Sequence, residues 1–281
     1  MVCPSPHLGG VDDGTPSNSA LQRQLLYAEY SESSLVINHV NLRKILAVTS
    51  SQLAPNLTVV RSFGRSNRRL FAMIVVVEKY NAHKYSHLIE KMYRLRAHVF
   101  HDRLGWDVQV VDGKERDKYD DEEPVYVIHT DDKAREVKGS LRLLPTTGPT
   151  LLAECFADTL PDAAHLSAPT IWEATRFCID DRLFDPGLLD GLFFASAEMI
   201  AGLGDVAVSA GIESIVGNFD ASVFRLYRRI GLQVEILGRT SRYGRPVYLG
   251  LFPISELLVR KVKQRLANAR PAFARMERMA A

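Results

Sequence analysis

From Met73 onward the sequence alternates between two kinds of hydrophobic pattern, and this alternation most constrains the fold. Short runs rich in β-branched residues, such as MIVVVEKY and IESIVGNF, have the composition of strands. Between such runs lie amphipathic stretches, one of which places Leu88, Met92, Leu95 and Val99 at helical spacing as a single apolar stripe. Strands that alternate with helices predict an α/β protein.

The order of the later elements follows from the same patterns. VYVIHT and KGSLRLLP, joined by the charged turn DDKARE, predict a hairpin. TIWEATRFCID predicts a strand, and a long helix is expected to open near Pro186. DASVFRLYRRIG predicts a helix with Asp220 as N-cap and Gly231 as its stop. The strands QVEILG and RPVYLGLFPI and a terminal basic helix complete the chain.

Residues 1–72 differ from the rest of the chain. Pro, Gly, Ser and Asn are scattered through MVCPSPHLGGVDDGTPSNS, and SFGRSNRRL follows neither helical nor strand periodicity. We therefore expect residues 1–72 to be a poorly ordered, mobile N-terminal extension, or an upstream mis-start of the gene model. Residues 73–281 are expected to form a single folded domain.

Charge and cysteine content exclude several classes of protein. Lys and Arg number 35 against 33 Asp and Glu, so binding to nucleic acid is not expected. Three widely spaced cysteines without a C-x-x-C pair predict neither a disulfide framework nor a metal site, which favours the cytoplasm. The N-terminus has no signal-peptide core, and no apolar run approaches the roughly 18 residues of a membrane span.

An acidic loop holds the first candidate site residues, Glu115, Asp117 and Asp120. A solvated loop is one interpretation of such a cluster. The other is a carboxylate cluster for a cationic ligand, because a sulfonium or ammonium group that leaves water needs negative partners. Residue types and spacing leave both interpretations open.

Glu173 and Arg176 lie within an otherwise apolar strand, between Trp172 and Phe177. Charges buried there need partners or a ligand, so the pair indicates a cleft. Strand periodicity would place the two side chains on opposite faces. If both line one site, a β-bulge or strong twist must lie between them. The alternative is one exposed carboxylate and one arginine that extends to the surface.

Two basic helix faces form the third grouping. Such faces are usually solvated surface, but guanidinium groups also bind phosphates and carboxylates through two bonds at once. They could therefore dock an acidic carrier protein or a phosphate-bearing thioester. No P-loop, nucleophile-elbow or zinc-protease motif is present. The residues concerned are Arg225, Arg228, Arg229, Lys261, Lys263 and Arg265.

Three segments, RLRAHVFHDRLGWDVQVVDGKERDKYD, GSLRLLPTTGPTLL and IWEATRFCID, resemble the acyl-homoserine-lactone synthase (autoinducer synthase) family. The resemblance covers Met73 to about residue 255, and residues 1–72 have no counterpart. PDAAHLSAPTIWEATRFCIDD and LGRTSRYGRPVYLG are most similar to the rhizobial-type branch. Every shared position of the family is present, namely Arg96, Phe100, Trp106, Glu115, Asp117, Asp120, Arg142, Phe156, Glu173 and Arg176.

The resemblance implies a fold similar to the N-acetyltransferases, in which a twisted mixed sheet has helices on both faces and a V-shaped cleft between two central strands. It implies a reaction between S-adenosylmethionine and an acyl thioester carried by acyl carrier protein or coenzyme A. The products would be N-acyl-homoserine lactone, a quorum-sensing signal, and methylthioadenosine. S-adenosylmethionine would be a substrate, so no cofactor and no metal are expected.

The resemblance also assigns roles to residues. Glu173 would be the general base for the substrate amine, and Arg176 would hold a substrate carboxylate or the pantetheine-side acceptor. Asp117 and Asp120 would supply a negative field, and Arg142 would pair with one of them to fix the loop. These roles are consistent with the chemistry expected from the residue types alone.

The remaining family positions lie near the expected ligand. Arg96 and Phe100 are one helical turn apart and would reach the ligand together. Trp106 would contact the sulfonium through cation–π attraction. Phe156 could equally be a core residue. Arg225, Arg228 and Arg229 would face the acidic carrier protein.

We therefore expect an acyl-homoserine-lactone synthase that acts in a bacterial cytoplasm and makes a long-chain signal. Two alternatives stay open at this point, a general acyl-CoA N-acyltransferase of the same fold and a non-catalytic module that binds a carrier protein. Release of methylthioadenosine distinguishes the synthase from both.

Overall fold

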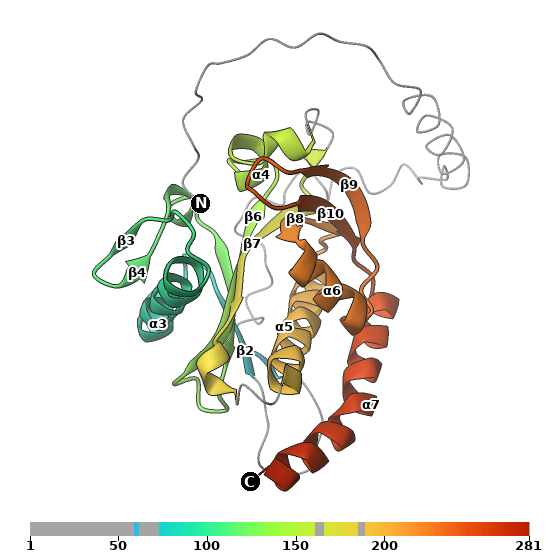
Figure 1. Ribbon diagram of the computed structural model, residues 1–281. Helices are drawn as coiled ribbons and strands as arrows, with labels where there is room; N and C mark the ends of the chain where they lie inside the picture. Colours follow the sequence, from blue (N-terminus) through green and yellow to red (C-terminus); the bar gives the residue numbers. More distant parts are fainter. Residues whose placement is uncertain (1–58, 62–72, 161–165, 185–188, 281) are drawn as a thin grey trace, which may run out of the picture. The chain divides into compact units, whose positions relative to one another are not determined.

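A computed structural model describes residues 59–61, 73–160, 166–184 and 189–280. Within these residues one sheet has the strand order β1-β2-β5-β6-β7-β8-β10-β9, and a separate small ribbon pairs β3 with β4 (Figure 1). Neighbouring strands of the large sheet are antiparallel except β7 and β8, which are parallel. The strands are β1 (Val59–Arg61), β2 (Met73–Val77), β3 (Val110–Val111), β4 (Lys114–Glu115), β5 (Val125–Thr130), β6 (Val137–Pro145), β7 (Ile171–Ile179), β8 (Ser214–Asp220), β9 (Glu235–Thr240) and β10 (Val247–Pro253).

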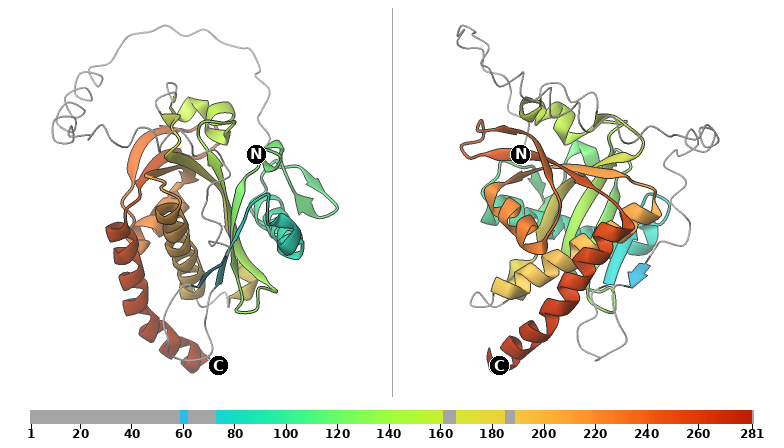
Figure 2. Two further views of the ribbon diagram at one scale, coloured as in Figure 1. Left: turned by 180° about the vertical axis from the view of Figure 1, so that it is seen from behind. Right: turned by 90° about the vertical axis from the view of Figure 1, so that its right-hand side faces the viewer.

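Helices cover both faces of the sheet, as Figures 1 and 2 show. On one face α3 continues directly into a π-helical stretch, and on the other α5 packs with α6 and α7. The fold predicted from the sequence, a mixed sheet between helices, is confirmed. The helices are α3 (Ser86–Arg96), the π-helical Ala97–Arg103, α4 (Leu151–Glu154), α5 (Leu189–Ser209), α6 (Ala221–Ile230) and α7 (Glu256–Ala280), with short 3₁₀ turns at Ala82–Tyr85, Lys118–Asp120, Ala157–Thr159 and Asp181–Leu183.

The apolar stripe predicted for α3 is confirmed. Leu88, Met92, Leu95 and Val99 are all at most 2% exposed and pack with Val75 and other residues on the sheet face below them. Burial of a side chain of this size contributes about 1.5–3 kcal/mol. The stripe therefore fixes the position of the π-helical stretch that follows, which carries part of the site described below.

Helix α5 fills the opposite face of the sheet. Its segment Gly191–Ser209 is long and apolar enough to cross a membrane, but 67% of that stretch is buried within the fold. Met199 and Ala207, both fully buried, pack with Ile74 and Val127 of the sheet. Such burial is the property of a core helix.

Local signals set the ends of α6 as predicted. The Asp220 side chain accepts hydrogen bonds from the backbone N–H groups of Ser222 and Val223, which caps the helix. Gly231 ends it in the left-handed conformation, with φ +85°. The hairpin of β5 and β6 also has the predicted strands.

Two predictions, the domain boundary at Met73 and the helix start near Pro186, concern segments that the structure describes only in part. Strand β1 precedes Met73 and pairs with β2, so the sheet begins before the boundary set from the sequence. The rest of residues 1–72 lies outside the described part, as does the expected helix start near Pro186.

Candidate active site

The centre of the site is an irregularity in β7. Ser140 of β6 pairs with Cys178 and Arg142 pairs with Thr175, so two residues of β7 lie opposite the single residue between them. Arg176 is one of the two, and its φ of +54° is unusual for a residue with a side chain. The sequence predicted a β-bulge or a strong twist if Glu173 and Arg176 both line one site, and the structure has a bulge that begins at Arg176.

The bulge also marks the place where β7 separates from β8. The two strands pair only from Ile171 to Glu173 with Ser214 to Val216. Beyond Glu173 the strands diverge, and this splay forms the V-shaped gap expected from the sequence. Parallel strands that part in the middle of a sheet leave an internal opening between its two faces.

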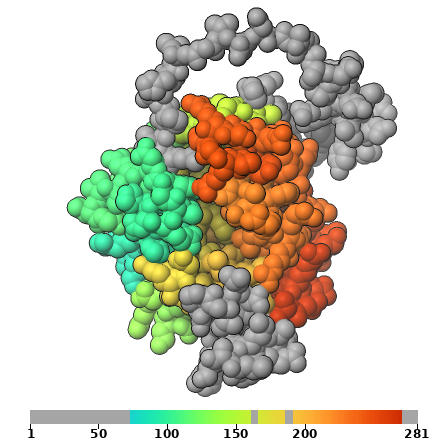
Figure 3. Space-filling model, in the orientation of Figure 1, coloured from blue at the N-terminus to red at the C-terminus, as the bar shows by residue number. Residues whose placement is uncertain are grey.

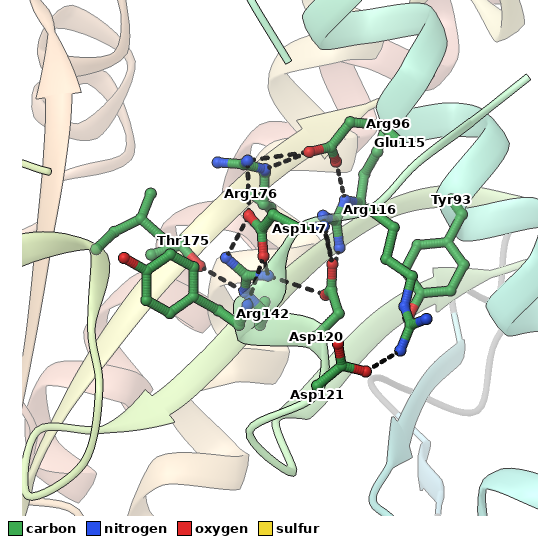
Figure 4. A network of polar contacts seen from close by, with 12 residues as sticks. Tyr93, Arg96, Glu115, Arg116, Asp117, Asp120, Asp121, Arg142, Thr175 and Arg176 are labelled. Carbon is green, nitrogen blue, oxygen red and sulfur yellow. Dashed lines mark hydrogen bonds and ion pairs between the residues drawn. The ribbon is translucent and has the colours of Figure 1, made fainter. Parts of the chain in front are cut away.

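Three guanidinium groups and three carboxylates form a buried network beside the splay (Figure 4). Arg96 donates from Nε to Glu115 at 2.5 Å and from its two terminal nitrogens to Asp120 at 2.8 and 2.9 Å. These two bonds to one carboxylate are the geometry that arginine favours. The members are Arg96, Arg142, Arg176, Glu115, Asp117 and Asp120.

The other two arginines complete the network. Arg142 Nη1 lies 2.5 Å from Asp117 and 2.9 Å from Asp120. Arg176 Nη2 lies 2.9 Å from Glu115 and 2.7 Å from Asp117. Arg142 therefore pairs with the acidic loop, as expected from the family, and Arg176 is held by two carboxylates of it.

Burial and pairing decide the charge state of these acids. Burial of Asp120 opposes its ionisation, but the neighbouring Arg96 outweighs this and holds the pKa well below its usual value. Burial also opposes ionisation of Asp117, and Arg142 reverses the effect, so that its pKa is lowered. A solvated acidic loop is thus the wrong interpretation, since Glu115 is 0% and Asp120 8% exposed.

Glu173 has a different environment from the network acids. It is 1% exposed, and its carboxylate accepts backbone hydrogen bonds from Leu151 at 2.9 Å and Leu152 at 2.7 Å, at the start of α4. Thr150 caps the same helix through its side chain. Burial nevertheless dominates and raises the pKa of Glu173 to about 7. A carboxyl group with this pKa can accept and donate protons near neutrality.

A cavity of about 1320 Å³ passes through the splay and is lined from both faces of the sheet. Phe100 and Trp106 line it on the α3 side, and Ile200 and Leu203 of α5 line it on the other. Glu173 is part of its wall. In Figure 3 a recess separates the green surface around α3 from the orange surface of α6.

An aromatic pair forms the wall on the α3 side. Phe100 and Trp106 stack with ring centroids 5.0 Å apart. Arg176 lies 5.6 Å from the Phe100 centroid, and Arg245 lies 5.9 Å from that of Trp106. Trp106 Nε1 is buried and has no hydrogen-bond partner among the described residues. A ligand cation at these rings would therefore share them with two guanidinium groups.

Comparisons with known proteins identify the family of this chain. The family model described as autoinducer synthase matches residues 80–262. An acyl-homoserine-lactone synthase of Rhizobium etli is 39% identical over 180 residues, which cover 64% of this chain and 83% of that protein. One of Agrobacterium fabrum is 33% identical over 174 residues, which cover 62% and 82%. The chain belongs to the autoinducer synthase family.

Solved structures show the same relationship in three dimensions. The acyl-homoserine-lactone synthase LasI matches with a TM-score of 0.56 and 31% identity, over 64% of this chain and 89% of that one. BjaI, described as a CoA-dependent synthase with S-adenosylmethionine and isopentyl-CoA, matches with a TM-score of 0.60 and 25% identity, over 70% and 90%. This autoinducer synthase is an acyl-homoserine-lactone synthase and hence an acyltransferase, and its resemblance to rhizobial members is confirmed.

The synthase distributes the residues predicted from its sequence over two places. Five of them, Arg96, Glu115, Asp117, Asp120 and Arg142, belong to the network and are not among the described residues of the cavity wall. The cavity wall holds Phe100, Trp106, Phe156, Glu173, Arg176, Arg225 and Arg229.

Arg228 does not reach the cavity wall of the synthase, although its neighbours in sequence do. Arg225 and Arg229 are one helical turn apart and share a face of α6, whereas Arg228 is exposed and lies off that face. Lys261 and Arg265 of α7 also line the cavity, and Lys263 pairs with Asp205 instead. Basic side chains of both α6 and α7 therefore line the cavity.

Sequence reasoning missed several residues of the site. Arg245 was not singled out, although it lies in the run LGRTSRYGRPVYLG that resembles the family. Thr175 accepts a hydrogen bond from Arg142 Nε at 3.1 Å, and the bulged register places these two residues opposite one another. Ser196 and Asn218 line the cavity from α5 and β8, and nothing in their local sequence distinguishes them.

Proposed function

We propose that this cavity joins S-adenosylmethionine to an acyl thioester, with Glu173 as the general base. The observation that carries the proposal is a buried carboxyl group, with its pKa raised to about 7, in the wall of a cavity that is lined from both faces of the sheet. Relatives support it, because BjaI was solved with S-adenosylmethionine and isopentyl-CoA and TofI with methylthioadenosine.

In this proposal the two faces of the sheet hold the two substrates. S-adenosylmethionine binds on the α3 side, against Phe100 and Trp106. The acyl chain lies on the α5 side, where Leu192, Ile200 and Leu203 form an apolar wall. Apolar lining suits a hydrocarbon chain, and aromatic rings suit a sulfonium. The reacting groups then meet at the splay, beside Glu173.

Glu173 acts in the first step. The substrate ammonium loses a proton to its carboxylate, directly or through a water molecule, and the free amine attacks the thioester carbonyl. The tetrahedral intermediate collapses to an amide as the carbon–sulfur bond breaks, and the thiol of the carrier leaves with a proton. The methionine carboxylate then attacks the carbon next to the sulfonium, which closes the lactone and releases methylthioadenosine.

Arg176 is suited to orient the substrate. Glu115 and Asp117 hold its Nε and Nη2, whereas Nη1 makes no hydrogen bond within the described part of the chain. A guanidinium that is fixed on one edge can offer its remaining N–H groups to a substrate carboxylate or to the acceptor carbonyl. The bulge supports this role because it turns Arg176 towards the network.

The network itself is proposed to hold the site residues in position and to take no part in the chemical steps. Its three arginines balance the charge of its three carboxylates. Most of the negative field proposed for Asp117 and Asp120 therefore acts within the network and not on a bound ligand. Asp117 has 19% of its side chain exposed and is the member best placed to influence a bound cation. Arg96 and Arg142 fix the acidic loop against β6 and β7.

The donor thioester is proposed to arrive along α6. Arg225 and Arg229 line the cavity, and guanidinium groups bind both the phosphates of coenzyme A and the acidic surface of acyl carrier protein. S-adenosylmethionine serves as a substrate, and the reaction is proposed to need no cofactor and to take place in the cytoplasm.

The test is release of methylthioadenosine from S-adenosylmethionine by the full chain, with a panel of acyl carrier protein and coenzyme A thioesters. Glu173→Gln should reduce the rate by about 10²–10⁴-fold, the usual contribution of a general base. Glu154→Gln is the matched control, since it removes a carboxylate of α4 that does not line the cavity. It should keep most of the wild-type rate.

Release that requires both the thioester and Glu173 would support the proposal, and the best donor would identify the carrier. A folded protein that releases no methylthioadenosine with any thioester would contradict it. Equal rates for wild type and Glu173→Gln would leave the reaction but remove Glu173 as its base.

A further inference from the structure

The α5 side of the cavity follows the helix over several turns. Leu192, Ser196, Ile200, Leu203 and Gly204 all line it, at the spacing that places residues on one face of a helix. The first and the last are twelve positions apart, which corresponds to about 18 Å along the axis. Beside α5 the cavity is thus a long channel, and its α5 wall is mostly apolar.

This channel has a tight point where α5 meets α7. A Cβ atom built on Gly204 would lie 2.7 Å from Val259 Cγ2, closer than side-chain carbons pack. Both residues line the cavity, and Val259 is 9% exposed. The walls of the channel therefore touch at this pair, and glycine is the residue that lets the two helices come so close.

Helix α7 is held in place by its own apolar stripe. Val259, Val262 and Leu266 are buried, and the last two pack with Ala197 and Ile230 of the neighbouring helices. Part of this wall lies beyond the segment that the family model matches, because Gln264, Arg265 and Asn268 also line the cavity. The α7 wall of the cavity is therefore built partly by residues outside the family match, whereas Val259 lies within it.

We infer that the contact between Gly204 and Val259 closes the acyl channel and limits the length of the acyl chain that the enzyme transfers. This inference rests on the proposed function, in which the acyl thioester occupies the α5 side of the cavity. A chain that reaches Val259 gains contacts with every added methylene until it meets this wall. Each buried methylene changes affinity by about fourfold, so a small change in wall volume alters the preferred length.

The experiment changes the volume of this one side chain in both directions. Val259→Ala removes two methyl groups and should move the preferred straight-chain thioester towards longer chains, by about two methylenes. Its preference for the longer chain over the original one should rise about fourfold per added methylene. Val259→Leu adds one methylene and should shift the preference towards shorter chains. The readout is kcat/KM for methylthioadenosine release across a graded series of acyl lengths.

Val206→Ala is the matched control. Val206 lies on α5, is 1% exposed and does not line the cavity, so the same two methyl groups are removed from a buried site elsewhere. It should lose stability but keep the wild-type preference. Opposite shifts for the two Val259 variants, with none for Val206→Ala, would support the inference.

Two other outcomes would overturn it and are distinguishable. Wild-type preferences in both Val259 variants, with methylthioadenosine still released, would reject the channel end while the proposed function stands. A wild-type enzyme that releases no methylthioadenosine with any chain would reject both. If Val259→Ala does not fold, Val259→Leu still decides the question.

Discussion

Asp120 and Glu173 are both buried carboxyl groups, and their pKa values are shifted in opposite directions. Asp120 accepts hydrogen bonds from Arg96 and Tyr126, and its pKa is well below the usual value. Glu173 accepts only backbone N–H bonds from α4 among the described residues, and its pKa is raised to about 7. Both groups are buried, so the difference between their pKa values comes from the guanidinium partner that, within the described part of the chain, only Asp120 has.

The difference shows how one region can hold both a rigid support and a reactive acid. An acid that is paired with arginine stays ionised over the physiological range and acts through its position. An acid that is buried with neutral donors changes protonation near neutrality and can transfer protons. Four predictions test this contrast.

The largest effect is expected from removing a cation of the network. Arg142→Met keeps most of the side-chain volume but leaves Asp117 and Asp120 with fewer positive partners in a buried site. The free energy of unfolding should fall by about 3–5 kcal/mol, as measured by urea denaturation at neutral pH. Arg116→Met, which breaks an exposed pair with Asp121, should cost less than about 1 kcal/mol. Equal losses of unfolding free energy for both variants would show that the buried network stabilises the fold no more than an exposed ion pair does.

The second prediction concerns the pH dependence of stability. Because the pKa of Glu173 rises from 4.5 to about 7 on folding, the folded state binds a proton that the unfolded state has lost. The stability of the wild type relative to Glu173→Gln should therefore fall as pH rises through this window, by roughly 3 kcal/mol in total. Above pH 7 the difference should be constant.

The network acids should show the opposite sign. The pKa of Asp120 is lowered, so its contribution is present above its unfolded pKa and is lost as the pH falls below about 4. Glu154→Gln serves as the control for the window of Glu173, because Lys118 lowers the pKa of Glu154. Thermal unfolding measured across this pH range distinguishes the contribution of Asp120 from that of Glu173. A stability that rises between pH 4.5 and 7 in the wild type, but not in Glu173→Gln, would contradict the raised pKa of Glu173.

Removing one hydroxyl group from the network should have a smaller effect. Tyr126 donates to Asp120 at 2.9 Å, and Tyr126→Phe should cost about 1.5–3 kcal/mol, as for hydrogen bonds to charged groups. Tyr93→Phe removes the Tyr93 hydroxyl, which bonds the neutral Tyr126 hydroxyl at 2.9 Å, and should cost about 0.5–1.5 kcal/mol. The order of the two losses in urea denaturation is the test, and a reversed order would argue against an ionised Asp120.

The last prediction concerns the pH dependence of the rate. If Glu173 must be ionised to act as base, kcat/KM for methylthioadenosine release should fall about tenfold per pH unit below pH 7. It should level off above that pH. Glu173→Gln should remove this limb of the profile. A wild-type rate that stays constant from pH 5 to 7 would mean that another group accepts the proton.

Local patterns predicted most of the fold. The α3 stripe, the β5–β6 hairpin and the caps of α6 at Asp220 and Gly231 depend on residues close in sequence, so the sequence carries them directly. A bulge or a strong twist in this strand was predicted for the case that both of its charges line one site, and the structure has a bulge at Arg176.

What the sequence could not show depends on long-range contacts. Glu115 and Arg176 are 61 positions apart, and no local pattern predicts that their charges cancel. The hydrogen bonds from α4 to Glu173 also escaped prediction, since a helix of four residues has no periodicity to detect. The place of α7 in the cavity wall depends on how three helices pack.

The bulge at Arg176 also limits how the length of this strand can vary. A deletion between Glu173 and Cys178 would remove the extra residue and restore regular pairing with β6, but it would turn one side chain of the site to the wrong face. An insertion would also turn one side chain of the site to the wrong face. Loops of this enzyme can therefore tolerate gains and losses of residues that β7 cannot, and the spacing of WEATRFC is as much a requirement of the chemistry as the residues themselves.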